Sequence, residues 1–272
     1  MPAIKRSLPL LVVVVLALLA GCHRNRFVPA NFRSNDALFQ ASLRQLTQHK
    51  WDNAVNGFQK LTTDLPARDP LLPQAYYYLG ESHTGRKEHI LAAQAYSRIP
   101  ESFPEDTLAG VATFKAGMSY SKLWRKPSLD SDYGETALTT LQSFLAAYPD
   151  SPLKDQAERE IAKLTEWFAT KNYDAGMFYL RRKGYDSAII YFTDVVTRYP
   201  QTEHARMAQL RLVEAYGKIN YKLELAETCA ALRQKYPNDG DVKDVCGTVP
   251  APTASTPPTP SPAAAAPAVP EP

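Results

Sequence analysis

The sequence lacks a strong net charge of either sign, which limits the kinds of molecule it can bind through charge. Of its 272 residues, 31 are Lys or Arg and 28 are Asp or Glu, which gives a formal net charge of +3 at pH 7. Proteins that bind nucleic acid usually concentrate basic residues on one face. The near balance of charge therefore predicts that the chain has no nucleic-acid partner.

Motifs for catalysis, phosphate binding and metal ligation are also missing. The sequence holds no H-E-x-x-H pair, no P-loop and no Rossmann glycine pattern. Residues 80–85 (GESHTG) are one residue longer than the G-x-S-x-G nucleophile elbow, and no strand pattern precedes them. His83 and His89 are not at the spacing of metal ligands on a helix. We therefore expect no enzyme activity, no cofactor and no metal ion.

Cysteine is scarce as well. The chain has three cysteines, too few for a disulfide-rich scaffold, beside 15 tyrosines that suggest a Tyr-rich helical interior. Cys229 and Cys246 lie close together in the C-terminal part of the sequence. In an oxidising compartment they could form a disulfide that holds the last helix, and otherwise they would be two separate buried thiols. The sequence leaves both interpretations open.

Long apolar runs are limited to the N-terminus. Residues 8–20 form an apolar stretch too short to span a bilayer comfortably, and Lys5 and Arg6 precede it. The stretch ends in LLAGC, which resembles the bacterial lipobox. We therefore predict a lipoprotein signal peptide over residues 1–21, cleavage before Cys22, and lipidation of Cys22 by acyl chains such as palmitate. An ordinary signal peptide with a chance cysteine is the alternative.

An acylated Cys22 would place the protein on a membrane. The lipobox implies a diacylglyceryl group on the thiol and a further acyl group on the new amine, more than the single chain that gives only marginal binding. His23 follows the cysteine, whereas an Asp at this place favours inner-membrane retention in known lipoproteins. The expected location is the periplasmic face of the outer membrane, with the acyl anchor in the lipid bilayer.

Composition divides the rest of the chain into three parts. Residues 22–34 are polar and basic and are interpreted as a tether, with a plain linker favoured over a contact to anionic head groups. Residues 35–247 carry helical periodicity. Residues 248–272 form a Pro/Ala-rich tail with nine of the 22 prolines, which cannot bury enough surface to fold and is expected to be disordered. The tail could be a passive extension, a spacer or a ligand for another protein.

The stretch Lys183–Thr202 defines the fold of the middle part. Its apolar residues step by four, three and four positions and so share one helical face: Ala188, Phe192, Val195 and Tyr199. Pro200 cannot continue the helix and therefore ends it. The stretch thus predicts a helix with one buried face and a sharp C-terminal stop.

This spacing recurs along the sequence. Aligned on the terminal proline, the matching sets are Ala54, Phe58, Leu61, Pro66; Ala92, Tyr96, Ile99, Pro104; Ala137, Leu141, Phe144, Pro149; and, more weakly, Leu225, Cys229, Leu232, Pro237. Small residues lie upstream, at 41–42, 80, 116–117 and 175–176. Such a pattern is typical of the tetratricopeptide repeat (TPR), in which small residues let helices approach closely. We predict an all-α fold, a TPR-like helical solenoid of about five helix-turn-helix repeats.

Two departures from the repeat period stand out. Lys126–Gly134 (KPSLDSDYG) is an insertion in the third repeat, expected to form either a partner-binding loop or a tolerated surface loop. After Ser151 and Pro152, which suit a helix start, a helical face continues through Tyr179. This predicts one helix of about 30 residues, roughly 45 Å long, that docks on neighbours or offers a binding surface.

The lipobox, the repeats and the run from Leu180 to Ala205 together resemble the BamD family of outer-membrane lipoproteins, over about residues 35–239. The most specific part is R-x-G-x-x-x-A…Y-P-x-T-x-x-A, carried here by Arg182, Gly184, Ala188, Tyr199, Pro200, Thr202 and Ala205. Ile190 and Tyr191 stand where proteobacterial members commonly have Asn-Arg, the arginine being linked to communication with BamA.

The resemblance implies a lipid-anchored scaffold of the β-barrel assembly machinery, the BAM complex. Such a protein binds the periplasmic POTRA region of the insertase BamA through its C-terminal repeats. It receives nascent, unfolded outer-membrane proteins on its N-terminal repeats. A different periplasmic TPR lipoprotein, serving the Tol-Pal system or cell division, remains the alternative. The superhelical part of a peptidoglycan lyase is a third interpretation, but the chain leaves no room for a separate catalytic domain.

Four residues are candidates to line a groove for such clients. Tyr76, Tyr77, Tyr78 and His83 fall on the first helix of the second repeat. Aromatic rings suit the C-terminal segments of nascent barrels, which themselves end in aromatics. Neighbours on a helix point about 100° apart, so the three tyrosines cannot all face one groove. Packing between repeats is the alternative role for each of them.

Overall fold

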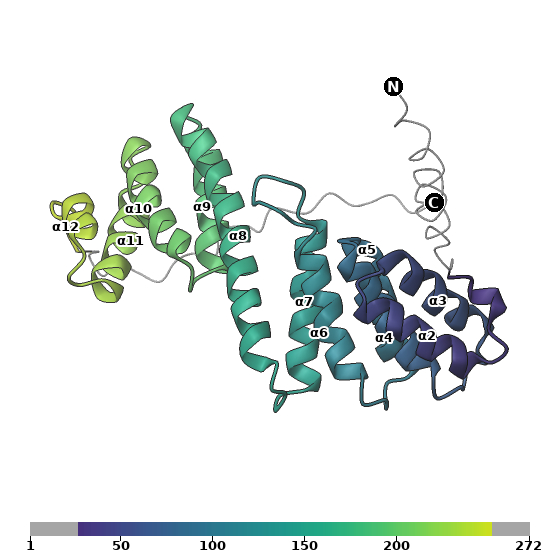
Figure 1. Ribbon diagram of the computed structural model, residues 1–272. Coiled ribbons are helices and arrows are strands. Elements are labelled where there is room, and N and C mark those ends of the chain that lie inside the picture. The colour runs from purple at the N-terminus through teal and green to yellow at the C-terminus, as the bar shows by residue number, and fades with distance from the viewer. Residues whose placement is uncertain (1–26, 252–272) are drawn as a thin grey trace, which may run out of the picture. The chain divides into compact units, whose positions relative to one another are not determined.

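The computed structural model of the chain describes residues 27–251, which form helices and no strand (Figure 1). The all-α fold class is thus confirmed. The predicted signal peptide, Cys22, much of the tether and most of the tail lie outside the described residues. The helices are η1 (Pro29–Asn31), α2 (Asn35–Thr47), α3 (Trp51–Asp64), α4 (Leu72–Gly85), α5 (His89–Ser102), α6 (Ala109–Ser121), α7 (Asp132–Ala147), α8 (Lys154–Arg181), α9 (Tyr185–Arg198), α10 (Glu203–Lys218), α11 (Lys222–Lys235) and α12 (Gly240–Cys246). Between residues 27 and 251, none of these helices has the length and apolarity that crossing a membrane requires.

The described residues fall into two compact units. Unit 1 comprises residues 27–125 and 129–161, and unit 2 comprises residues 126–128 and 162–251. The boundary therefore falls inside α8, between Ile161 and Ala162. Unit 1 holds α2–α7 and the first part of α8, and unit 2 holds the rest of α8 and α9–α12.

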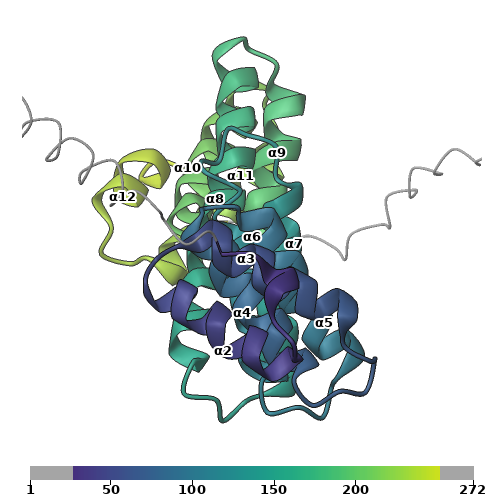
Figure 2. The ribbon, with the colours of Figure 1, turned by 45° about the vertical axis from the view of Figure 1, so that its right-hand side comes forward.

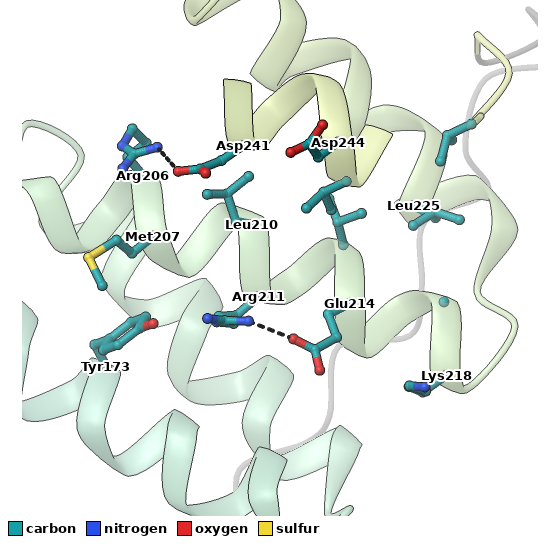
Figure 3. Close-up of a pocket in the computed structure, with 14 residues that line it drawn as sticks. Tyr173, Arg206, Met207, Leu210, Arg211, Glu214, Lys218, Leu225, Asp241 and Asp244 are labelled. Carbon is teal, nitrogen blue, oxygen red and sulfur yellow. Dashed lines mark hydrogen bonds and ion pairs between the residues drawn. The ribbon is translucent and has the colours of Figure 1, made fainter. Parts of the chain in front are cut away.

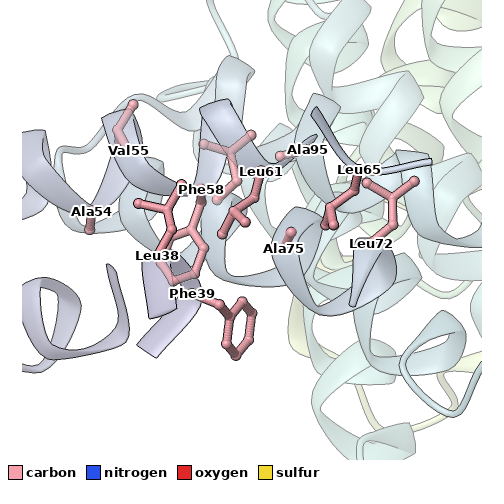
Figure 4. Close-up of a cluster of buried hydrophobic side chains, with 11 residues drawn as sticks. Leu38, Phe39, Ala54, Val55, Phe58, Leu61, Leu65, Leu72, Ala75 and Ala95 are labelled. Carbon is pink, nitrogen blue, oxygen red and sulfur yellow. The ribbon is translucent and has the colours of Figure 1, made fainter. Parts of the chain in front are cut away.

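Consecutive helices pack against one another in unit 1 (Figures 1 and 2). The apolar residues that share a helical face in the sequence meet in a core between α2, α3, α4 and α5 (Figure 4). Phe58 and Leu61 are fully buried there. Burying a side chain of this size contributes about 1.5–3 kcal/mol. Because each core is shared by neighbouring helices, each helix pair depends on the next for its stability.

Glycine sets how closely two helices approach in both units. A Cβ at Gly80 of α4 would lie 2.5 Å from ring carbon Cε1 of Tyr96 on α5, and a Cβ at Gly176 of α8 would lie 2.6 Å from Cε1 of Phe192 on α9. Both distances are far shorter than a van der Waals contact. The predicted close approach of helices at small residues is confirmed at these two positions.

The turns between paired helices also repeat. His49, Lys87, Lys183 and Asn220 each have a positive φ of 55–62°, and each lies between the two helices of a pair. A left-handed conformation costs a residue with a Cβ roughly 1–2 kcal/mol. The pair α6 and α7 is the exception, because its connection is longer. The packing of the helices thus enforces one turn geometry on four different sequences.

The long helix predicted after Pro152 is confirmed, because α8 runs for 28 residues. It begins slightly later than predicted, since the Ser151 side chain accepts a hydrogen bond from the backbone N–H of Leu153 (3.3 Å) and closes a turn first. The predicted insertion ends three residues too late, and the connection between α6 and α7 is residues 122–131. Helix α7 begins at Asp132, so Gly134 lies inside it. The buried ring of Trp124 occupies the space that a side chain at Gly134 would take.

Candidate functional site

A groove of about 830 Å³ lies in unit 2 (Figure 3). It is bounded by α8, α10, α11, α12 and the segment that follows α12. Tyr173 and Leu225 lie at opposite ends of the view in Figure 3. The lining residues are Tyr173, Arg206, Met207, Leu210, Arg211, Val213, Glu214, Gly217, Lys218, Leu225, Asp241, Asp244, Val245 and Val249. The groove thus has an apolar floor and charges of both signs along its walls.

Arg206 joins two walls of this terminal groove. Its guanidinium donates hydrogen bonds to Glu203 (2.9 Å) on its own helix, to Asp239 (2.8 Å) before α12 and to Asp241 (3.3 Å) in α12. The hydrogen bond to Glu203 and then the bond to Asp241 raise the pKa of Arg206 against the opposing effect of burial. Arg206 therefore stays charged and ties α12 to α10.

Arg211 lies farther along the same helix. It pairs with Glu214 at 2.9 Å. The Tyr173 hydroxyl on α8, and then Glu214, raise the pKa of Arg211 against the opposing effect of burial. Arg211 therefore stays charged on the lining of the terminal groove.

Helix α12 is held in place by two further interactions. Cys229 of α11 and Cys246 of α12 form a disulfide, 17 residues apart in the sequence. Arg233 donates hydrogen bonds to the carbonyl oxygens of Cys246 and Val249, the latter at 2.8 Å. Val242 packs into the same apolar cluster. The chain after Val249 therefore starts from a fixed point at the edge of the terminal groove.

A second surface of unit 2 is apolar and exposed, and we call it the apolar end. It consists of Phe178, Ile190, Tyr221 and Leu223, with exposed fractions of 43%, 68%, 48% and 54%. These residues lie near the turns from α8 to α9 and from α10 to α11, which come at the same end of unit 2 (Figure 1). Exposed large apolar side chains on neighbouring helix pairs make this end of unit 2 a candidate interaction site.

Ring contacts fix the geometry of the apolar end. Tyr216 stacks on Tyr221, with ring centroids 6.3 Å apart. Tyr191 stacks on Tyr179 with centroids 5.4 Å apart. Each of the two helix pairs is therefore braced by an aromatic stack near its turn.

The surroundings of the apolar end are basic. The Arg182 guanidinium lies 3.8 Å from the centroid of the Phe178 ring. The charged residues of the two turns and the adjoining helix ends are Arg181, Arg182, Lys183, Lys218 and Lys222 against Asp186 and Glu224. Such a rim favours a partner with an apolar centre and acidic surroundings.

The four candidate groove residues of the N-terminal part divide between two cavities of unit 1. Tyr76 and His83 line a cavity of about 490 Å³ beside α3 and α5. Tyr77 and Tyr78 line another of about 410 Å³ at the start of α6. The division follows from the 100° step between neighbouring residues on a helix. No single groove therefore brings all four residues together within the described part of the chain.

Two of these four residues serve packing as well. Tyr78 stacks on Phe58 with centroids 5.6 Å apart and meets Phe39 edge-on at 5.9 Å. His83 is buried, and its Nδ1 lies 2.7 Å from a carboxylate oxygen of Glu88. Tyr78 and His83 thus contribute to the core and to the turn between α4 and α5. Tyr77 is the member whose environment is most polar.

Tyr77 belongs to a charged cluster between α4 and α6. The Lys115 ammonium lies 2.6 Å from Oε1 of Glu81 and 5.6 Å from the Tyr77 ring centroid. The Tyr96 hydroxyl donates a hydrogen bond to the same Glu81 oxygen. Burial lowers the pKa of Lys115, but the hydrogen bond and charge of Glu81 outweigh it, and the pKa is raised. The cluster thus offers a charged donor beside aromatic faces.

Burial changes the titration of the two tyrosines in this Tyr77–Lys115 cluster. Burial raises the pKa of Tyr77. It raises the pKa of Tyr96 much further, and the hydrogen bond to Glu81 adds to the rise. Both hydroxyls are therefore protonated at neutral pH and act as hydrogen-bond donors. Tyr77 of this cluster also lines the cavity at the start of α6. The cluster can therefore contact both the rings and the main-chain groups of an extended polypeptide.

The residues of the sequence motif in the fourth repeat lie at the two ends of α9 and at the start of α10. Ala188 is fully buried, and Tyr199 stacks on Phe168. The Thr202 side chain accepts a hydrogen bond from the backbone N–H of Ala205 (3.1 Å), which caps α10. Gly184 precedes α9, and Pro200 follows its end. Arg182, by contrast, lies on the apolar end.

Sequence reasoning missed the terminal groove. A signal was present on α10, where Met207, Leu210 and Glu214 follow at steps of three and four on a face other than that of the buried Ala208 and Leu212. The opposite wall comes from α12, about 30 residues farther along the chain. The sequence alone does not show that these segments meet.

Comparison with known proteins gives a consistent result. A family model described as "YfiO: Outer membrane lipoprotein" matches residues 32–232. The outer membrane protein assembly factor BamD of Caulobacter vibrioides is 26% identical over 235 residues, which cover 84% of this chain and 75% of that protein. BamD of Rickettsia prowazekii is 23% identical over 232 residues, 83% of this chain and 90% of that protein. Among solved structures, the P58(IPK) TPR domain matches 78% of this chain and 54% of that chain with a TM-score of 0.42 and 14% identity.

Proposed function

Because the chain belongs to the YfiO family of outer membrane lipoproteins, we propose that it serves in the assembly of outer membrane proteins as a non-enzymatic scaffold. In this role it binds a BamA-like insertase through its POTRA region and receives unfolded outer-membrane proteins. The observation that carries the proposal is the match to assembly factors named BamD over more than four fifths of the chain.

The apolar end of unit 2 supports an insertase contact. Ile190 is the most exposed of the large apolar side chains in residues 27–251, at 68%, and Tyr191 beside it stacks on Tyr179. These two residues stand where related proteins commonly have Asn-Arg. The contact proposed here is therefore mainly apolar and aromatic, and the basic rim pairs with acidic residues of the insertase.

The Tyr77–Lys115 cluster of unit 1 supports a client contact. Tyr77 and Lys115 are partly exposed, and Tyr96 with Glu81 holds them in place from below. Rings of a client segment pack on Tyr77, and main-chain carbonyls accept hydrogen bonds from Lys115. Helices α4 and α6 supply this surface, so a client would lie across the second and third helix pairs.

The anchor belongs to the proposal as well. Lipidation at Cys22 would hold the protein at the periplasmic face of the outer membrane, a few residues before the described helices begin. The lipobox supports this placement, and so does the family description as an outer membrane lipoprotein. The scaffold would then work at the membrane into which its clients are inserted.

Recovery of partners tests the insertase contact. The chain is extracted in mild detergent through a C-terminal tag, and the co-purifying proteins are quantified by mass spectrometry. The wild type is expected to recover a POTRA-bearing insertase in near-equal amount. Ile190→Asp should reduce that recovery by about tenfold, since losing an apolar anchor commonly costs 1–2 kcal/mol.

Leu91→Asp is the matched control. Leu91 is also exposed, at 41%, but lies on α5 of unit 1, and this variant should recover the insertase as well as the wild type. Recovery of Tol-Pal or division proteins without the insertase would replace the proposal by the adaptor alternative. Equal losses of insertase recovery in both variants would contradict an insertase contact at the apolar end.

A further inference from the structure

The terminal groove begins where the described chain ends. Val249 lines the groove, and its carbonyl oxygen is held by Arg233 at 2.8 Å. The disulfide between Cys229 and Cys246 fixes the helix just before it. The described chain therefore ends two residues after Val249, a groove residue that these contacts hold in place.

The floor of the terminal groove suits an uncharged, extended segment. Leu210, Val213, Leu225 and Val245 provide apolar surface, and Tyr173 adds an aromatic ring at one side (Figure 3). Val245 of α12 lines the groove and is 40% exposed. Arg206 and Arg211 already have carboxylate partners. The groove thus offers apolar contact surface, and its two arginines do not need a charged ligand as partner.

Residues 252–272 match this surface in composition. They contain eight prolines, are otherwise mainly Ala, Thr, Ser and Val, and carry Glu271 as their one charged side chain. Segments of this kind favour the polyproline II conformation, which docks in grooves lined by apolar and aromatic groups. At about 3.1 Å per residue, 21 residues reach roughly 65 Å, more than a cavity of this size needs.

We propose that residues 252–272 of the same chain bind in the terminal groove and cover it. Only two residues join Val249 to this segment, so the effective concentration of the segment at the groove is on the order of millimolar. A weak apolar contact is then enough to fill the groove for much of the time. Any partner segment that uses this groove must first displace the tail, which makes the tail a built-in competitor. This inference does not depend on the assembly role.

Methyl NMR tests the inference directly. The complete chain from His23 onward is compared with the same chain ending at Ala251, which retains every described residue. The methyl signals of Leu210, Val213 and Leu225 should differ between the two proteins, whereas those of Leu61 and Leu141 in unit 1 should not. A synthetic peptide of residues 252–272, added to the shortened chain, should restore the signals of the complete chain.

Two variants separate docking from indirect effects. Val245→Asp places a charge on the groove floor and should abolish the response of the shortened chain to the peptide. Leu223→Asp is the control, because Leu223 is exposed but does not line the groove, and its response should match the wild type. Superimposable groove signals in the complete and shortened wild-type chains would overturn the inference. So would a peptide response confined to residues outside the groove.

Discussion

The absence of a side chain at a few positions sets the spacing of paired helices. Gly176 faces the Phe192 ring so closely that an added Cβ would overlap it. Gly217, also in unit 2, has no heavy atom within 4 Å of the place its Cβ would take, apart from its chain neighbours and the backbone of its own helix. These two glycines differ in surroundings although both lie in helices. They therefore give a matched test of the packing.

Gly176→Ala is expected to lower the free energy of unfolding of unit 2 by about 1–3 kcal/mol, because the Phe192 ring must move. Gly217→Ala should raise it by roughly 0.5–1 kcal/mol, since alanine is the better helix former and meets no neighbour. Urea unfolding followed by circular dichroism measures both changes. The same sign for the two substitutions would contradict the close approach of α8 and α9.

A second residue-scale prediction concerns His89 at the start of α5. Burial and then the positive charges of Lys122, Arg125 and Lys87 lower the pKa of His89 from 6.5. Its Nδ1 is buried and has no hydrogen-bond partner among the described residues. The folded chain therefore binds fewer protons at this ring than the unfolded chain does.

The free energy of unfolding should consequently fall as the pH drops through 6.5 and below. His89→Gln removes the titrating ring, so its urea midpoint should decrease less between pH 7.5 and 5.5 than that of the wild type. Lys122→Gln should also reduce the decrease, because it removes one of the repelling charges. A His89→Gln protein with the full wild-type decrease would show that other groups cause it.

At the scale of elements, the repeat pattern in the sequence predicts the helices and their order. It predicts less well which side chains meet. The long helix α8 could be predicted because no Gly or Pro interrupts its periodic face before Gly176. The start of α7 was misplaced, since nothing local shows that Trp124 fills the space at Gly134. Lys115 and Glu81 are 34 residues apart, and only the packing of α4 and α6 brings them together.

Helix α12 gives the prediction at this scale. It is short, and the disulfide with α11 adds to its few apolar contacts. Cross-linking residues 17 apart is expected to contribute about 3 kcal/mol by limiting the unfolded chain. Cys246→Ser should lower the free energy of unfolding of unit 2 by about that amount.

Reductant provides the control for this prediction. It should lower the urea midpoint of the wild type to that of Cys246→Ser and leave the variant unchanged. A wild type that is insensitive to reductant under unfolding conditions would contradict a stabilising role of the disulfide. The same pair of proteins also tests whether the terminal groove needs α12, because Asp241 and Val245 belong to that helix.

At the scale of the whole molecule, the two units carry different surfaces. Unit 1 offers the Tyr77–Lys115 cluster, and unit 2 offers the apolar end and the terminal groove. The sequence named the N-terminal tyrosines as candidates that cannot all face one groove, and the structure divides them between two cavities because neighbouring positions on α4 point in different directions. Two units with separate surfaces suit a scaffold that holds more than one partner.

The central claim is that this chain serves the assembly of outer membrane proteins, and depletion in its host tests the claim most directly. The chain is placed under a repressible promoter, and the folded barrel proteins of the outer membrane are quantified by their heat-modifiable mobility on gels. The account predicts that folded barrels fall and unfolded precursors accumulate before growth stops, and that the wild-type gene restores both. Normal barrel levels in depleted cells that show division or envelope-constriction defects would contradict it.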